Sequence, residues 1–174
     1  MYHIELVEGK YCQQEKTKEK FVAEHGKTTS LLLRLTERIS DTGKVVLLDS
    51  GFGVLEALLI LKKQGVFASS LVKKWRYWHK HIKGDKIMTA LENIEVGTTK
   101  RQPGELAGVK FDLFCLKEPD YNMILMSTYG SLSCNVDQRD SVCIVNGILK
   151  IFKYNVFLGN YYKYRCAVDA HNAK

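Results

Sequence analysis

Two aspartates stand where a carboxylate could bind a divalent cation. Asp49 ends the apolar run "KVVLLD" at residues 44–49 and is followed directly by the turn sequence "SGFG". In open α/β sheets, ligands bind beyond the carboxyl ends of the strands, which is where this residue is expected. Mg²⁺ takes one or two protein carboxylates together with water and phosphate oxygens. Asp169, on the last expected helix with Asn172 on the same face, is the second candidate ligand, and such a metal site would serve phosphoryl transfer.

Each aspartate also has a purely structural interpretation. Asp49 or Ser50 could accept the free backbone amides of a helix that begins near Val54, and spacing alone favours this N-cap. Asp169 could form an i, i+4 ion pair with Arg165. The spacing of these residues leaves both interpretations open.

A basic and aromatic stretch is the other candidate site. "KKWRYWHKHIK", residues 73–83, contains five Lys or Arg, two Trp, two His and one Tyr. Cationic side chains contact phosphates and aromatic rings stack on bases, so this composition predicts a nucleic-acid contact. The residues expected to make it are Lys73, Lys74, Trp75, Arg76, Lys80 and Lys83. The alternative is a loop whose aromatic rings anchor it to the core and whose lysines are merely solvated.

The elements that must position these residues alternate along the first 73 residues. A strand is predicted at "YHIELVE", a helix in the second half of "KEKFVAEHGKTTSLLLRLTERIS", a strand buried on both faces at "KVVLLD", a helix at "GVLEALLILKKQG" and a strand at "VFASSLVK". In the second helix, the apolar residues expected to face inward are Leu55, Leu58, Leu59 and Leu61. This alternation predicts an α/β sheet with right-handed crossovers.

The remainder of the chain is less regular. Residues 74–108 are polar and interrupted by glycine and proline, which predicts an insertion or a long connection. "GVKFDLFCLKEPDYNMILMSTYGSLS" predicts a β-hairpin with its turn at "KEPDYN". The C-terminal segment has Phe157, Tyr161, Tyr164 and Val168 at helical spacing.

Composition narrows the class of protein. A chain of 174 residues with 45% hydrophobic content predicts one domain with an ordinary core. Its net charge of +7 attracts polyanions such as DNA. Five cysteines without a C-x-x-C pair argue against a disulfide framework, and no apolar run approaches the roughly 18 residues that span a membrane. We therefore expect an intracellular protein. Its thiols fit either the cytosol or the nucleus, and of the two we expect the nucleus.

Several stretches, in this order along nearly the whole chain, resemble the transposase domain of the piggyBac transposable-element family. They are "ELVEGK", "GKVVLLDSGFGVLEALLILKKQG", "VKKWRYWHKHIKGD", "EPDYNMILMSTYG" and "FKYNVFLGNYYKYRCAVDAHN". The similarity is to the variant whose third acidic motif is written V-D-x-H-N. It implies a ribonuclease H-like fold, in which a mixed sheet is flanked by helices and carries a β-hairpin insertion. It also implies cut-and-paste DNA transposition with three aspartates (the DDD motif) and Mg²⁺.

The resemblance assigns roles to single residues. Asp49 matches the second aspartate, in the family's D-[NS]-x-F motif with Phe52 as its aromatic residue, and Asp169 matches the third. Gly51 stands where the family usually has a bulky aromatic residue, and His79 where it has a proline. Asp49 and Asp169 are therefore the expected catalytic and metal-binding residues.

The family's first aspartate belongs to a first strand upstream of the segment that matches "ELVEGK". We therefore expect residues 1–174 to form a single partial domain that lacks this strand and is inactive as a transposase on its own. The edge left exposed would allow self-association. The alternative function is a non-catalytic nucleic-acid-binding domain that uses the basic residues 73–83.

Overall fold

The structure is a computed structural model in which residues 16–72, 82–129, 139–145, 147–154, 158–159 and 161 are described. The helices are α1 (Lys16–Thr36), α2 (Leu55–Lys63) and α3 (Gly84–Glu92). The strands are β1 (Val45–Leu48), β2 (Phe67–Leu71), β3 (Thr99–Leu106), β4 (Val109–Lys117), β5 (Asn122–Ser127), β6 (Arg139–Val145) and β7 (Ile148–Tyr154). The strand predicted for residues 2–8 lies outside the described residues. Within those residues, no helix has both the length and the apolar composition to cross a bilayer.

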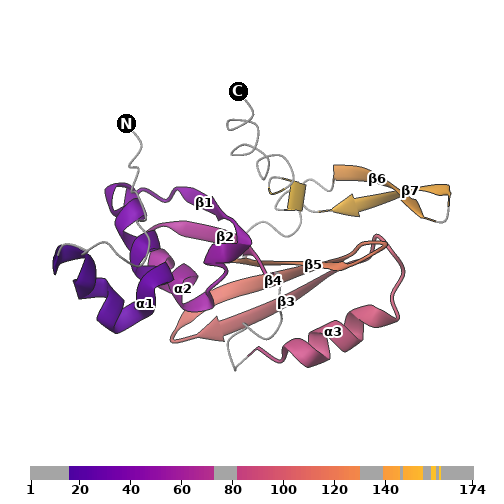
Figure 1. Ribbon diagram of the computed structural model, residues 1–174. Helices are drawn as coiled ribbons and strands as arrows, with labels where there is room; N and C mark the ends of the chain where they lie inside the picture. Colours follow the sequence, from indigo (N-terminus) through magenta and orange to yellow (C-terminus); the bar gives the residue numbers. More distant parts are fainter. Residues whose placement is uncertain are drawn as a thin grey trace, which may run out of the picture.

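Five strands form one mixed sheet in the order β1-β2-β5-β4-β3 (Figure 1). β1 and β2 run parallel and are joined by α2, whereas the other neighbouring strands run antiparallel. The predicted strand–helix–strand alternation is confirmed at β1–α2–β2, and the predicted hairpin is β4–β5. A five-stranded mixed sheet with its helices is consistent with the ribonuclease H-like fold that the resemblance implies.

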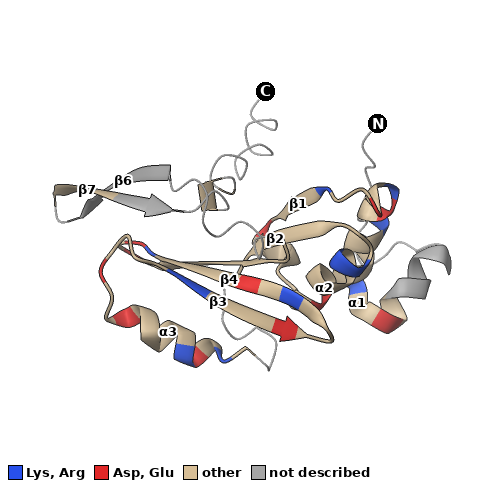
Figure 2. Cartoon of the chain, turned by 180° about the vertical axis from the view of Figure 1, so that it is seen from behind, with Lys and Arg blue, Asp and Glu red and all other residues tan. Residues whose placement is uncertain are grey.

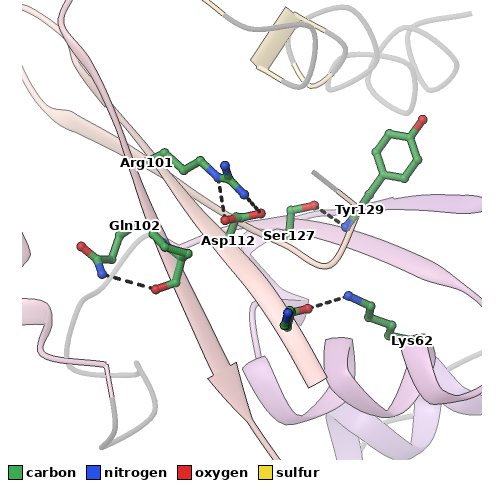
Figure 3. A network of polar contacts seen from close by, with 8 residues as sticks. Lys62, Arg101, Gln102, Asp112, Ser127 and Tyr129 are labelled. Atoms are coloured by element: carbon green, nitrogen blue, oxygen red, sulfur yellow. Dashed lines mark hydrogen bonds and ion pairs between the residues drawn. The ribbon is translucent and has the colours of Figure 1, made fainter. Parts of the chain in front are cut away.

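The helices cover one face of this sheet. Leu113 of β4 and Leu58 of α2 belong to one buried cluster, which α1 joins through Leu32. Farther along the same face, Cys115 packs with Leu91 of α3. The apolar residues predicted to face inward from α2 are all buried: Leu55, Leu58, Leu59 and Leu61. Lys62 connects α2 to β4, because its Nζ donates a hydrogen bond of 2.6 Å to the backbone carbonyl of Lys110 (Figure 3).

The opposite face of the sheet has its own apolar cluster. Side chains alternate along a strand, so Phe114 and Leu116 point away from the helices. They pack with Leu125 of β5 and with Leu158 and Tyr161 from the C-terminal segment. Tyr161 is helical, as its spacing predicts, whereas Phe157, Tyr164 and Val168 lie outside the described residues.

β1 is an edge strand, and this corrects one prediction. The apolar run "KVVLLD" predicts burial on both faces, but Val45 is 38% exposed. Among the described strands, only β2 pairs with β1, and no described strand lies along its other side. The carbonyl of Lys44 accepts a hydrogen bond of 2.9 Å from the backbone N–H of Phe67. Alternate backbone groups of β1 therefore point away from β2, and self-association through this edge stays a prediction.

Two turns hold the parallel strands side by side. The N–H of Asp41 donates to the carbonyl of Gln64 at 2.8 Å, and the N–H of Gly43 donates to that of Gly65 at 2.9 Å. Gly65 has a φ of +68°, and a Cβ on it would lie 2.7 Å from the Cα of Asp41. Only glycine suits this position, where the segment before β1 crosses the segment before β2.

The stretch 74–108 contains two of the described elements. α3 lies in it, and β3 forms the edge of the sheet opposite β1. β3 contains Pro103, which is tolerated because an edge strand has one side without ladder hydrogen bonds. Gly104 lets the Phe111 ring lie over the strand, because a Cβ at position 104 would collide with that ring. That this stretch is an insertion in the domain stays a prediction.

Candidate functional site at the end of β1

Asp49 is exposed at the carboxyl end of β1. Its backbone is extended, with φ −66° and ψ 163°, and a 3₁₀ turn at Ser50–Phe52 follows. Its side chain makes no capping hydrogen bond to this turn, and the N-cap residue of α2 is Val54. The structure therefore does not use the Asp49 carboxylate as a helix cap, which leaves its oxygens accessible from solvent.

The main chain of Asp49 is fixed by its neighbours. Its carbonyl accepts hydrogen bonds from the hydroxyl of Ser70, at 3.0 Å, and from the N–H of Phe52, at 2.9 Å. Ser70 is fully buried at the end of β2. A Cβ on Gly53 would lie 3.0 Å from the carbonyl oxygen of Leu71, so the loop after Asp49 packs closely on β2. The β2 strand thereby sets the position from which the carboxylate projects.

Ser70 and Gly53 are positioning residues that sequence reasoning missed. The available signal was the pair of serines in the otherwise apolar strand "VFASSLV". A buried hydroxyl needs a hydrogen-bond partner, and for Ser70 that partner is the Asp49 carbonyl.

The segment that leads toward Asp169 begins at the same end of the sheet. Tyr161, the last described residue, is buried in the cluster against which Leu71 packs. Leu71 directly follows Ser70, the residue bonded to Asp49. Asp169 itself lies outside the described residues. The structure thus brings the Asp49 loop and the start of the C-terminal segment to one end of β2.

A row of buried polar residues crosses the face opposite the helices. Nε of Arg101 lies 2.7 Å from Oδ1 of Asp112, and Nη2 lies 3.0 Å from Oδ2 (Figure 3). Asp112 is paired in register with Ser127, which is paired with Ser69, and the two serine hydroxyls are 2.8 Å apart. Because Arg101 occupies both oxygens of Asp112, this row stabilises the sheet and does not offer a free ligand.

Of the predicted nucleic-acid contacts, Lys83 is described and exposed at the N-terminus of α3. Lys73, Lys74, Trp75, Arg76 and Lys80 lie outside the described residues. Lys83 and Lys86 line a cavity of about 400 Å³ between α3 and the β3–β4 pair, where Glu105 also lies. Basic and acidic residues lie side by side on α3 and β3 (Figure 2).

The Asp49 carboxylate fits a hard divalent cation as a single ligand. It is exposed and accepts no capping hydrogen bond, so its oxygens can replace water around Mg²⁺. In the part of the chain that the structure describes, no group of three His, Cys, Asp or Glu side chains gathers into a metal site. The predicted second ligand, Asp169, lies outside that part.

One of three comparisons with known proteins found a match. A family model described as Transposase IS4 matches residues 1–174. Neither the curated proteins nor the solved structures gave a significant match to the chain.

Proposed function

The chain belongs to the Transposase IS4 family, and we propose that it carries part of a catalytic centre for metal-dependent cleavage and transfer of DNA strands. Within that family we assign it to the piggyBac type, on the ordered motifs from "ELVEGK" to "AVDAHN". Asp49 and Asp169 are the proposed metal ligands. The nucleus, where such an activity meets chromosomal DNA, is the proposed site of action.

The observation that carries this proposal is that Asp49 is exposed and that its side chain makes no capping hydrogen bond. A carboxylate at the carboxyl end of a sheet strand, exposed and without a capping role, is available to a ligand. The family match across the whole chain makes a DNA phosphate with its metal the ligand to expect. A carboxylate that served only as a helix cap would instead accept hydrogen bonds from the backbone amides of the turn that follows it.

The residues of this chain would act by binding the cation and fixing its position. Bound Mg²⁺ would supply activation of the attacking oxygen and neutralisation of the phosphate charge. Asp49 would bind the cation through its carboxylate, while Ser70 and Phe52 hold its carbonyl and so fix the backbone from which the side chain projects. A ligand group held within about 0.5 Å of its working position is what such a site requires.

The test is a DNA nicking assay with the full chain, titrated with Mg²⁺ or Mn²⁺. It asks for strand nicking alone, because a chain without the family's first aspartate is expected to be inactive in transposition on its own. We expect Asp49→Asn to lower metal-dependent nicking by more than about 100-fold, because it removes a ligand charge while conserving shape. Asp120→Asn is the matched control, since Asp120 is an exposed aspartate in the β4–β5 turn. Nicking that survives Asp49→Asn at the control rate would overturn the role of Asp49.

A second candidate function is nucleic-acid binding without catalysis, which the net charge of +7 favours. It predicts DNA affinity that falls steeply with salt and does not change in Asp49→Ala or Asp169→Ala. Reversing the charges of Lys73, Lys74, Arg76 and Lys80 would abolish that affinity. Binding that persists after those four changes would contradict the assignment of residues 73–83 as the DNA-binding segment.

A further inference from the structure

The strands β6 and β7 form a sheet of their own. They pair antiparallel from Arg139 opposite Tyr154 to Val145 opposite Ile148. The loop between the last pair is the two-residue sequence Asn-Gly, with Gly147 at a φ of +76°. Short Asn-Gly loops match the natural twist of a hairpin. In Figure 1 the hairpin lies apart from the five-stranded sheet as a narrow ribbon.

The tip of this hairpin is apolar and uncovered. Ile148, Leu149 and Ile151 are 65%, 62% and 66% exposed. Elsewhere among the described residues, the most exposed large hydrophobic side chain is that of Tyr121, at 52%. Burying an Ile or Leu side chain contributes about 1.5–3 kcal/mol to the free energy of unfolding. The exposure of three such side chains to water therefore leaves a substantial stabilisation unused. Three such exposed side chains within four residues point to a binding surface rather than to a role in the core.

The charges of the hairpin indicate what binds there. Arg139, Lys150 and Lys153 are basic and Asp140 is acidic, so the two strands carry a net charge of +2 within a chain of net charge +7. In the pairing register, Asp140 stands opposite Lys153, whereas Lys150 stands opposite the uncharged Cys143. A second copy of the chain would bring like charges together, but a polyanion would complement them.

The shape of the ribbon agrees with duplex DNA. The major groove is about 12 Å wide and admits a two-stranded β-ribbon. Basic residues along such a ribbon can reach the phosphates on either side, and apolar side chains at its tip can contact thymine methyl groups or base edges.

We propose that the β6–β7 hairpin is a DNA-contacting ribbon that enters a groove of the duplex. Its basic residues lie against the phosphates, and Ile148 and Leu149 lie against the bases at its tip. This rests on the proposed function in so far as DNA is the substrate. It adds a contact surface distinct from Asp49 and from residues 73–83.

The test measures the binding of the full chain to a fluorescein-labelled duplex by fluorescence anisotropy. We expect Ile148→Ser with Leu149→Ser to weaken binding about tenfold, because the tip loses its apolar contact with the bases. Lys150→Glu with Lys153→Glu is expected to weaken it at least as much and to lower the slope of log K against log salt by about two. Tyr121→Ser and Lys110→Glu, exposed positions on the β4–β5 hairpin, are the matched controls and should stay within about twofold of the unmodified protein.

Three results would overturn the proposal. The first is equal DNA affinity in the hairpin variants and their controls, and the second is absence of DNA binding by the unmodified chain. The third is a tip variant that turns a dimer into a monomer in sedimentation without a change in DNA affinity, since the surface would then belong to a second copy. Circular dichroism confirms that each variant is folded. Asp49→Asn should lose nicking while keeping DNA affinity, so failure of the hairpin proposal and failure of the Asp49 assignment are separable.

Discussion

The hairpins β4–β5 and β6–β7 differ in burial. Neighbouring elements cover the apolar side chains of β4–β5, whereas the apolar tip of β6–β7 is exposed. Both are antiparallel pairs of strands joined by a short turn. In β4–β5, Leu113 packs toward the helices and Phe114 packs toward the C-terminal segment, and both are buried. In β6–β7, the apolar side chains at the tip are more than 60% exposed. The strand pattern alone therefore does not decide whether a hairpin serves the core or a partner, because neighbouring elements decide it.

Substitutions in the two hairpins should therefore affect different properties of the protein. Substitutions in β4–β5 should act on the stability of the whole domain, because its residues fill both clusters of the sheet. Substitutions at the tip of β6–β7 should leave stability unchanged and act on binding.

The largest expected effect on stability is at the ion pair that ties β3 to β4. Asp112 is 1% exposed, and its partner charge among the described residues is Arg101, whose side chain is 37% exposed. We expect Arg101→Ala to lower the free energy of unfolding by about 3–5 kcal/mol, since it leaves a buried carboxylate without its counter-charge. Asp112→Asn should cost less, because Arg101 can then turn to water.

Urea denaturation measures both variants, with Gln102→Ala, an exposed neighbour on β3, as the control. If Asp112→Asn proved the more damaging of the two, the explanation by burial of charge would be wrong.

The direct comparison of the hairpins is Leu125→Ala in β5 against Ile151→Ala in β7. Leu125 is fully buried, so its truncation should lower the free energy of unfolding by about 2–5 kcal/mol. Ile151 is 66% exposed, and its truncation should change stability by less than about 0.5 kcal/mol. Thermal unfolding followed by circular dichroism gives both values. A large cost for Ile151→Ala would mean that the β7 tip is covered in solution by the chain itself.

A smaller effect concerns the stability of β4 at high pH. Burial raises the pKa of the Cys115 thiol from 9.0 to about 11, and nearby Lys100 acts in the opposite direction. In the unfolded chain the thiol ionises near pH 9.0, while in the folded chain it keeps its proton up to about pH 11. The unfolded state therefore binds fewer protons in this window, and stability falls as the pH rises through it, by up to about 3 kcal/mol.

The measurement is the difference in unfolding free energy between the unmodified protein and Cys115→Ala, taken at intervals from pH 8 to pH 11. Subtracting the variant removes the contribution of every other titrating group. Parallel curves for the two proteins would show that Cys115 is not the source of the pH dependence.

The sequence predicted the elements whose signals are local. The alternation in "FDLFC" and the turn "KEPDYN" predicted β4–β5, and the spacing of four leucines predicted the buried side of α2. The β6–β7 hairpin was missed although its signal is also local, since Asn-Gly separates the apolar runs "VCIV" and "ILKIF". The helical spacing of Phe157, Tyr161, Tyr164 and Val168, directly after these runs, is a competing local signal that favours a helix.

The parts that sequence could not predict depend on contacts between distant segments. The hydrogen bond from Ser70 to Asp49 joins residues 21 positions apart, and that between Ser69 and Ser127 spans 58. No local pattern predicts such pairs, and the edge position of β1 likewise depends on which strands lie beside it. For the same reason, spacing could not separate a capping Asp49 from an accessible one, whereas the geometry of the following turn does.

Binding of Mn²⁺ tests most directly whether Asp49 is a metal ligand. Paramagnetic Mn²⁺ added below one equivalent should broaden the backbone amide signals of residues 49–53 in NMR spectra of the full chain. Signals around Asp120 should persist, and Asp49→Asn should remove the broadening. Undiminished signals at residues 49–53, or the same broadening in Asp49→Asn, would contradict the assignment of Asp49 as a metal ligand.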